Sequence, residues 1–579
     1  MKNRSEAIKK IFIVLITVVC LSACNKNRQT PPQGGSHNEA PMTEEESSAE
    51  DAVEQRCVYN GSAVTITQAD TIKCLCSDGM LIYYYDKNLR TAEVLHASLN
   101  FAGTHVAIPS YLLFENRRYT VTSIAPQAFF QLDIETVFIP NSIVSIGKKA
   151  FLHCQRLGLV EIPGSVTYIG DEAFSQCWNL TSLVLNNGLK TIGSGAFYNC
   201  KELKEVTIPS SIVAMSDGVF ESCNAVTILT IKGEGNMPIG DGAFNYMKSL
   251  TTLIIEEGVT SIGNKAFTGC NSLKEVTIPS SVTFIGDDAF RDCEALSSLT
   301  LNEGLLWIGE HSFAGCYELR NLTIPSSVDA IGNWAFQSCR SLSNLTIRDG
   351  VKSVGSCAFS GTAIQSVTLP SSIEELGQSV FSYCDSLQHI SLSSCISALS
   401  PRTFFSCKSL RQIEIPEGTI IIGNEAFKNC ERLSSVSLPS SLKEIGSNVF
   451  ENTNIAHITL PENLESIGEG AFSYANQLQE LILPKSIKKL NSSICSDCVS
   501  LKTIVIPELV TNIGYGVLGG CDNLQSIYCY AKEPPTSENK HEFSFMRIHQ
   551  ITLYVPAESV SDYTSVLPWK VFNHVLPIP

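Results

Sequence analysis

The sequence predicts a repeat solenoid with short parallel β-strands, about 18 turns of 23 residues and a cap at each end. The main evidence is a phenylalanine that recurs at 129, 151, 174, 197, 220, 244, 267, 290, 313, 336, 359, 381, 404, 427, 450 and 472, and Cys495 and Leu518 continue the register. Of the 17 intervals, thirteen are 23 residues, three are 22 and one is 24. A unit this short cannot enclose its own core, so stacked turns must bury shared columns of apolar side chains.

Composition narrows the class of protein. With 579 residues, 44% hydrophobic and 17% charged, the chain is typical of a globular protein rather than a disordered or multi-span membrane protein. The net charge of −16 argues against a nucleic-acid partner, whose phosphates attract clustered Lys and Arg. Length alone would suggest several domains, but the repeat predicts one elongated body over residues 121–530.

Residues 1–24 are typical of an export signal, because basic residues precede a short apolar run that starts at Ile11. The run is about half as long as a helix that spans a bilayer. The following Leu-Ser-Ala-Cys resembles the lipobox of bacterial lipoproteins, which implies lipidation at Cys24, contact with the membrane through the lipid anchor only, and a place in the outer membrane, exposed at the surface. An ordinary signal peptide, or an unprocessed anchor with an incidental cysteine, remains the alternative.

Two segments separate this signal from the repeats. Residues 25–56 are rich in Pro, Gly and Glu and poor in large apolar side chains, so they predict a disordered acidic tether. Residues 57–120 predict an N-terminal cap, and residues 531–579 a C-terminal cap. Caps are expected because an open solenoid edge pairs readily with another chain.

Within a turn, the apolar positions predict the path of the chain, as in CNSLKEVTIPSSVTFIGDDAF at 270–290. Val276 and Ile278 alternate with polar residues, as in a strand with one buried face. Pro279 lacks an N–H and ends that strand, and Gly286 lets the chain turn before the Ala-Phe pair.

This pattern, V-x-x-I-G-x-x-A-F-x-x-C after the strand, closely resembles the BspA-like leucine-rich repeats of bacterial surface proteins over residues 121–530. The resemblance implies a leucine-rich repeat solenoid that contacts host extracellular proteins, other bacteria or glycans.

A cysteine follows the recurring Phe by three residues in most turns, and we call this position the Cys slot. Its members are Cys154, Cys177, Cys200, Cys223, Cys270, Cys293, Cys316, Cys339, Cys384, Cys407, Cys430, Cys498 and Cys521. Leu132, Met247, Thr362, Thr453 and Ala475 fill the slot in other turns. A slot that accepts these residues without an obligate partner predicts free, buried thiols rather than disulfides or zinc ligands.

No catalytic motif is present, so we expect neither an enzyme nor a cofactor or metal site. Acidic turns such as Glu256-Glu257-Gly258 and Asn302-Glu303-Gly304 leave calcium open as an alternative to ordinary solvated turns.

Two surfaces are candidates for binding. The strand-face strip comprises Thr277, Thr300, Thr323, Thr346 and Thr368, which occupy one outward position in five consecutive turns. The aromatic patch comprises Phe284, Trp307, His311 and Trp334, which stacking should gather across three turns. Cross-strand Thr pairing and packing of the rings against neighbouring turns are the respective alternatives that need no ligand.

Together these features predict a monomeric cell-surface lipoprotein whose solenoid is an adhesion or recognition module for a host or bacterial surface protein or a glycan. The alternative is a non-adhesive envelope scaffold or a nutrient-capture accessory protein, and binding of the purified protein to cells separates the two.

Overall fold

The computed structural model describes residues 54–579 except for 60–61, 68–72, 78–79, 99–100, 102, 115–116, 538, 540–541 and 544–545. The predicted signal peptide, Cys24 and the predicted tether up to residue 53 therefore lie outside the described residues. The first described strand begins at Glu54, three residues before the predicted start of the N-terminal cap at 57.

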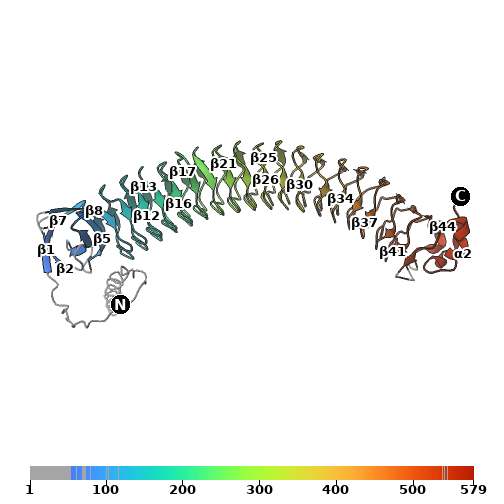
Figure 1. Cartoon of the computed structure of the whole chain (residues 1–579), viewed down its shortest axis with the longest axis horizontal. Coiled ribbons are helices and arrows are strands. Elements are labelled where there is room, and N and C mark those ends of the chain that lie inside the picture. Colours follow the sequence, from blue (N-terminus) through green and yellow to red (C-terminus); the bar gives the residue numbers. More distant parts are fainter. Residues whose placement is uncertain are drawn as a thin grey trace, which may run out of the picture. The chain divides into compact units, whose positions relative to one another are not determined.

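The N-terminal segment forms a sheet that leads into the solenoid (Figure 1). Its strands are β1 (Glu54–Tyr59), β2 (Ser62–Thr67), β3 (Lys73–Ser77), β4 (Leu81–Asp86), β5 (Thr91–Ala97), β7 (Tyr111–Phe114) and β8 (Arg117–Ile124). Antiparallel pairs join β1 to β2, β3 to β4, β4 to β5 and β7 to β8. Within this sheet β8 also pairs in parallel with β10 (Ser145–Ile146), a short strand of the repeats. The N-terminal strands therefore cover the first edge of the repeats.

Most turns of the repeat region contribute a first strand and a shorter second strand, and the turns stack in a row (Figure 1). The turn of β37 (Ser466–Ile467) has a second strand only. The first strands are β6 (His105–Ala107), β9 (Thr136–Phe138), β11 (Leu159–Ile162), β13 (Ser182–Leu185), β15 (Glu205–Ile208), β17 (Ile228–Ile231), β19 (Thr252–Ile255), β21 (Glu275–Ile278), β23 (Ser298–Leu301), β25 (Asn321–Ile324), β27 (Asn344–Ile347), β29 (Ser366–Thr368), β31 (His389–Ser391), β33 (Gln412–Glu414), β35 (Ser435–Ser437), β38 (Glu480–Ile482), β40 (Thr503–Ile506) and β42 (Ser526–Cys529). The second strands are β10 (Ser145–Ile146), β12 (Tyr168–Ile169), β14 (Thr191–Ile192), β16 (Ala214–Met215), β18 (Met237–Ile239), β20 (Val259–Ile262), β22 (Phe284–Ile285), β24 (Trp307–Ile308), β26 (Ala330–Ile331), β28 (Ser353–Val354), β30 (Glu375–Leu376), β32 (Ala398–Leu399), β34 (Ile421–Ile422), β36 (Glu444–Ile445), β37 (Ser466–Ile467), β39 (Lys489–Leu490), β41 (Asn512–Ile513) and β43 (Thr536–Ser537).

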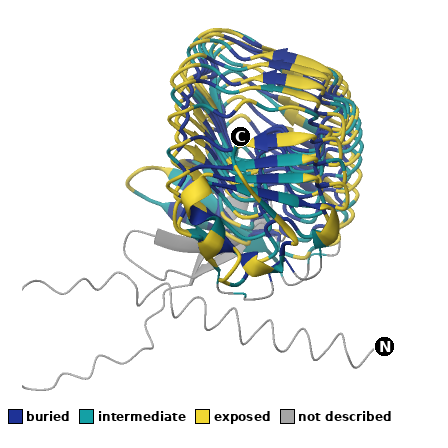
Figure 2. Ribbon diagram, turned by 90° about the vertical axis from the view of Figure 1, so that its right-hand side faces the viewer, coloured by how far each residue is buried: buried dark blue, intermediate teal, exposed yellow. Residues whose placement is uncertain are grey.

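Within each sheet, strands of the same kind pair in parallel from one turn to the next, so the predicted parallel solenoid is confirmed. The pairing is interrupted between some turns, as between β23 and β25. First strands align residue by residue, as where Val276 pairs with Leu299, and second strands do the same, as where Ile285 pairs with Ile308. Buried and exposed residues alternate along the strands (Figure 2). This alternation places the apolar residues of every turn in columns inside the stack.

The recurring phenylalanines form one continuous buried stack from Phe129 to Phe472, which we call the Phe column. Consecutive ring centroids lie 4.8 to 5.8 Å apart, as in the pairs Phe129–Phe151 and Phe220–Phe244. The rings are close to parallel, and the largest tilt is 18° between Phe450 and Phe472. The spacing matches that of parallel strands, so each added turn continues both the sheets and the ring stack.

The Cys slot is a packing position, as predicted, because all thirteen of its cysteines are buried free thiols. Each thiol of the Cys slot also has a polar partner in the neighbouring turn. For example, the Cys177 Sγ donates to the Phe151 carbonyl at 3.3 Å, and the Cys293 Sγ donates to the Phe267 carbonyl at 3.4 Å. A small side chain with a weak donor fits this corner of the coil. The sequence leaves open a disulfide between two of Cys57, Cys74 and Cys76 in the N-terminal cap, and the side chains of all three lie outside the described residues.

The C-terminal segment closes the last turns. It contains η1 (Ile548–Gln550), β44 (Thr552–Val555), η2 (Ala557–Ser559), α2 (Val560–Tyr563), η3 (Trp569–Val571) and β45 (His574–Pro577), and β44 and β45 extend the sheet of first strands beyond β42. The fully buried Trp569 donates through Nε1 to the Pro535 carbonyl at 2.7 Å. Within the described part of the chain, no helix has the length and hydropathy needed to cross a membrane.

Candidate functional site

The strand-face strip lies on the exposed side of the first strands. Thr277 pairs with Thr300, and Thr323 pairs with Thr346, in parallel register on adjacent strands. All five threonines of the strip are exposed. The structure therefore places the strip on the exposed side of successive first strands, in an arrangement that cross-strand Thr contacts also explain.

The strip carries a shallow hollow of about 360 Å³ at Thr300 and Thr323. At its rim the Arg348 guanidinium donates to the Glu303 carboxylate at 2.9 Å. Farther along the same face, Asn344 donates to the Asn321 side chain at 2.7 Å.

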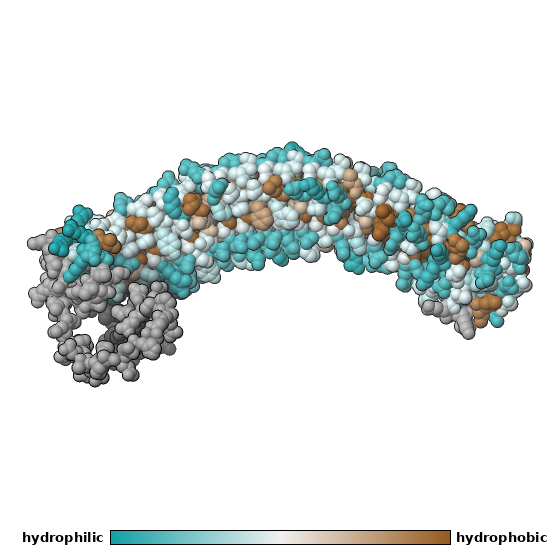
Figure 3. Space-filling view, viewed as in Figure 1, coloured by the Kyte–Doolittle hydropathy of each residue, from teal (hydrophilic) through white to brown (hydrophobic). Residues whose placement is uncertain are grey.

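Phe284 and Trp307 lie side by side on the exposed side of the second strands. They are register partners on β22 and β24, and their side chains are 40% and 41% exposed. Exposed large apolar residues elsewhere form separate patches on the face drawn in Figure 3. Two neighbouring rings on a sheet surface are therefore a local concentration of apolar area.

His311 and Trp334 form a second, separate pair. Their rings stack with centroids 4.9 Å apart and planes 3° from parallel, and both residues are half-buried. Both have left-handed backbones, with φ of 51° and 54°, a conformation that recurs at this position in the other turns. The structure therefore arranges the aromatic patch as two pairs: Phe284 and Trp307 are register partners, and His311 and Trp334 stack between neighbouring turns.

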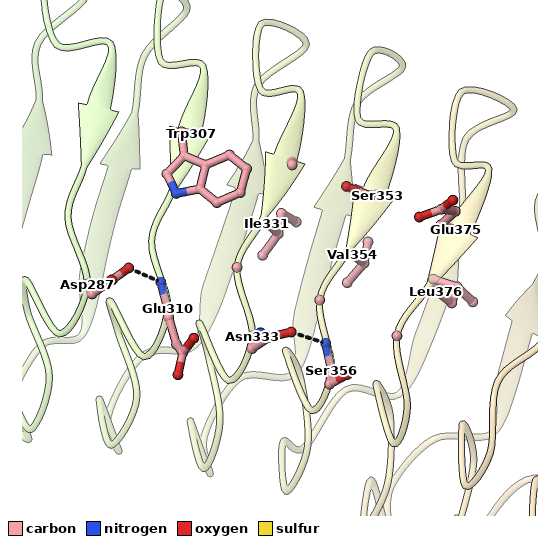
Figure 4. A pocket seen from close by; sticks show the side chains of 14 residues that line it. Asp287, Trp307, Glu310, Ile331, Asn333, Ser353, Val354, Ser356, Glu375 and Leu376 are labelled. Carbon is pink, nitrogen blue, oxygen red and sulfur yellow. Dashed lines mark hydrogen bonds between the residues drawn. The ribbon is translucent and has the colours of Figure 1, made fainter.

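A trough of about 450 Å³ begins at Trp307 (Figure 4). It follows one position of the second strands, which Trp307, Ala330, Ser353 and Glu375 occupy in four successive turns. Because Ala330 and Ser353 are much smaller than Trp307, the surface drops beside the indole ring. The rings of His311 and Trp334 do not line this trough.

The floor of the trough is backbone held by close stacking between turns. A Cβ at Gly332 would lie 2.7 Å from the Glu310 backbone nitrogen, so only glycine permits this approach. Along one edge, side-chain oxygens accept from the next turn: Asp287 from the Glu310 N–H and Asn333 from the Ser356 N–H, each at 2.8 Å (Figure 4). These bonds make the trough a rigid feature of the stacked turns.

The trough is an acidic environment. Glu310 and Glu375 line it, and neither carboxylate is paired with a Lys or Arg among the described ion pairs, although Glu310 lies 3.5 Å from the His311 ring nitrogen. The neighbouring cation Lys352 is held by Asp329 at 2.9 Å, and this hydrogen bond raises the pKa of Lys352. Carboxylates that lack a Lys or Arg partner among the described residues, in a trough that an exposed indole also lines, favour a cationic ligand.

The acidic turns have a structural role. The Glu257 carboxylate accepts from the backbone N–H groups of Ser280 and Ser281 in the next turn, at 3.1 and 3.0 Å. The Ser280 N–H, joined by the serine hydroxyls, lowers the pKa of Glu257. Glu303 caps the following Ser-Ser pair in the same way. In the described residues no group of three or more His, Cys, Asp and Glu side chains is arranged to hold a metal ion.

Sequence reasoning identified Trp307 but missed the residues that shape the trough beside it. Ser353 and Glu375 occupy the slot of Phe284 and Trp307 in later turns. The sequence does contain this signal. In successive turns the slot holds two aromatic residues, then two small residues and then an acidic residue. When only the large side chains of this slot are considered, the small residues beside them are not recognised as part of a site.

Comparison with known proteins identifies the family of the repeats. The family model for the BspA type leucine-rich repeat region matches residues 120–236, 237–362, 307–417 and 397–525. A leucine-rich repeat protein from Bacteroides ovatus is 24% identical, with 78% of this chain and 93% of that chain covered and a TM-score of 0.42. A leucine-rich cell surface protein from Faecalibacterium prausnitzii is 27% identical over 68% and 94% of the two chains, with a TM-score of 0.35. The pneumococcal vaccine antigen PcpA is 15% identical over 88% and 100%, with a TM-score of 0.33. No curated protein matches the sequence significantly.

Proposed function

Because the chain belongs to the BspA-type leucine-rich repeat family, we propose that it is a surface lipoprotein whose solenoid recognises a protein or glycan partner. The family and the fold are those of a repeat protein suited to binding. The finer steps of the proposal are anchoring through Cys24, display at the cell surface and recognition through the face of the second strands. The observation that carries the recognition step is the exposed Phe284–Trp307 pair beside the trough.

Physical considerations favour recognition over a non-adhesive scaffold. Exposed aromatic area beside a rigid hollow is typical of binding hot spots, since a ring of this kind contributes large contact area at small entropic cost. A scaffold that only supports assembly needs no such local feature. The same stack offers repeated polar strips, which suits wide contacts.

Display at the surface is tested by protease treatment of intact cells that express the wild-type chain or Cys24→Ala. We expect the wild-type protein to be digested on intact cells and the variant to be lost from the membrane fraction. Protection of the wild-type protein until the envelope is broken would contradict surface display and favour the scaffold alternative.

Recognition is tested with the purified full-length chain and whole host or bacterial cells, measured by flow cytometry. We expect Trp307→Ala to reduce cell binding about tenfold or more. Tyr168→Ala is the matched control, because Tyr168 occupies the same slot on β12 and is 43% exposed. Equal binding by Trp307→Ala and the wild-type protein would contradict the assignment of this face.

A further inference from the structure

The trough beside Trp307 has a chemistry more specific than general recognition. It combines the exposed indole of Trp307 with two carboxylates, Glu310 and Glu375, that no Lys or Arg neutralises among the described residues. We propose that the trough binds the side chain of a Lys or Arg residue of a protein partner. This inference rests on the proposed recognition function and names its partner chemistry.

The dimensions suit such a side chain. The turns of Ala330, Ser353 and Glu375 span two strand spacings of about 4.8 Å each, so the open part of the trough is roughly 10 Å long. The aliphatic stem of a Lys or Arg side chain lies over Ala330, against the edge of the Trp307 ring. Its cationic head then reaches the Ser353 hydroxyl and the Glu375 carboxylate, which stand at the far end in Figure 4.

Electrostatics select against other ligands. Asp287 and Glu310 also line the trough, and Lys352, which precedes Ser353 in the sequence, is held by Asp329. Anionic groups are repelled by these carboxylates, whereas a cation at the far end of the trough gains the Glu375 carboxylate while its aliphatic stem packs against the Trp307 ring. A neutral sugar could also pack on an indole, but it would leave these carboxylates without a counter-charge.

The inference is tested by ¹⁹F NMR of the full-length chain labelled with 5-fluorotryptophan. The chain has four tryptophans, and Trp307→Phe assigns the resonance of interest. The probes are the peptide acetyl-Gly-Gly-Arg-Gly-Gly-amide, the same peptide with citrulline in place of arginine, and maltotriose. We expect the arginine peptide to shift the Trp307 resonance at concentrations on the order of millimolar, with the citrulline peptide much weaker.

Variants locate the ligand. Glu375→Gln should weaken the arginine peptide about two- to fivefold, as loss of one exposed ion pair predicts. Glu444→Gln is the matched control, because Glu444 occupies the same slot on β36, three turns farther along, and should change nothing. Ser353→Phe should abolish the shift by filling the trough, and it should fold normally because the slot already accepts Phe284.

Equal shifts from the arginine and citrulline peptides, or no shift from either, would overturn the inference. So would retention of binding by Ser353→Phe. A shift with maltotriose alone would identify a glycan ligand, which overturns the inference and leaves the proposed recognition function intact. If the wild-type chain does not bind cells at all, by contrast, the proposed recognition function itself is contradicted.

Discussion

Individual side chains stabilise this protein through contacts with the same position in the next turn. The Cys slot shows the principle, because each thiol lies in a dry corner and donates to a carbonyl of the preceding turn. Burial raises the pKa of Cys270, Cys339 and Cys430 to about 12. The thiolate is the reactive form, so these cysteines are chemically protected by packing.

Native thiols should therefore differ sharply in reactivity. With iodoacetamide at pH 8, we expect Cys270, Cys339 and Cys430 to stay unmodified while the exposed Cys395 is alkylated. Mass spectrometry of tryptic peptides measures the extent at each site, and alkylation in guanidinium chloride is the control that all sites are detectable. Comparable labelling of Cys270 and Cys395 in the native protein would contradict the buried packing slot.

The acidic turns predict a pH dependence. Because folding lowers the pKa of Glu257, its stabilising effect is present above the unfolded value near 4.5 and is lost as pH falls through the folded value. Glu257→Gln should cost about 0.5 kcal/mol of unfolding free energy at pH 7, a value kept small by exposure to solvent. The cost should shrink as the pH falls below 4.5.

Urea unfolding at several pH values measures this difference. Glu256→Gln is the matched control, because that neighbouring side chain accepts no hydrogen bond among the described residues. A difference between Glu257→Gln and wild type that stays constant down to pH 2.5 would show that the carboxylate charge is not responsible.

At the scale of the element, the turn of 23 residues is the unit of structure. A turn contributes one first strand, one second strand and one ring to the Phe column, and it contacts mainly the turns on either side. In such a stack, stability is approximately a sum over turns and interfaces.

Removal of one complete turn should therefore be tolerated. Deletion of residues 178–200 joins Cys177 to Lys201 and lets Phe174 stack on Phe220 in the place of Phe197. We expect a folded protein whose melting temperature changes by no more than about 5 °C, measured by circular dichroism.

Deletion of residues 178–188 is the contrasting control, since half a turn shifts the apolar columns out of register and should prevent folding of that region. Equal damage from both deletions would show that the turns are not interchangeable units.

At the scale of the whole molecule, the two ends need protection. β42, the last first strand of the repeats, is covered by β44 and then β45, in a sheet that also contains β38 and β40. At the other end, the sheet of β1 to β8 precedes the second strands. Without such covers, an open parallel edge presents unpaired N–H and C=O groups to other molecules.

Truncation before residue 531 should therefore cause self-association. The shortened chain exposes the edge of β42 and the apolar surface under Trp569. Sedimentation velocity should show oligomers at micromolar concentrations, whereas the full-length chain remains monomeric. A truncated protein that is monomeric and as stable as the full chain would show that residues 531–579 do not act as a cap.

The repeat, its period and the residues of its interior can be predicted from the sequence alone. Residues such as Phe290 and Cys293 recur in nearly every turn, and a periodic residue in a stack has the same surroundings each time. Its contacts can therefore be inferred from spacing alone. The strand-face strip could be placed for the same reason, because parallel register carries Thr277 next to Thr300.

The features that do not repeat follow only from the three-dimensional structure. The rings of His311 and Trp334 stack on each other and do not line the trough that begins at Trp307. The structure also reveals the trough, in which the small Ala330 and Ser353 follow the much larger Trp307 at one position of successive second strands (Figure 4). Side-chain direction and local differences in size leave no periodic trace, so three-dimensional packing had to resolve them.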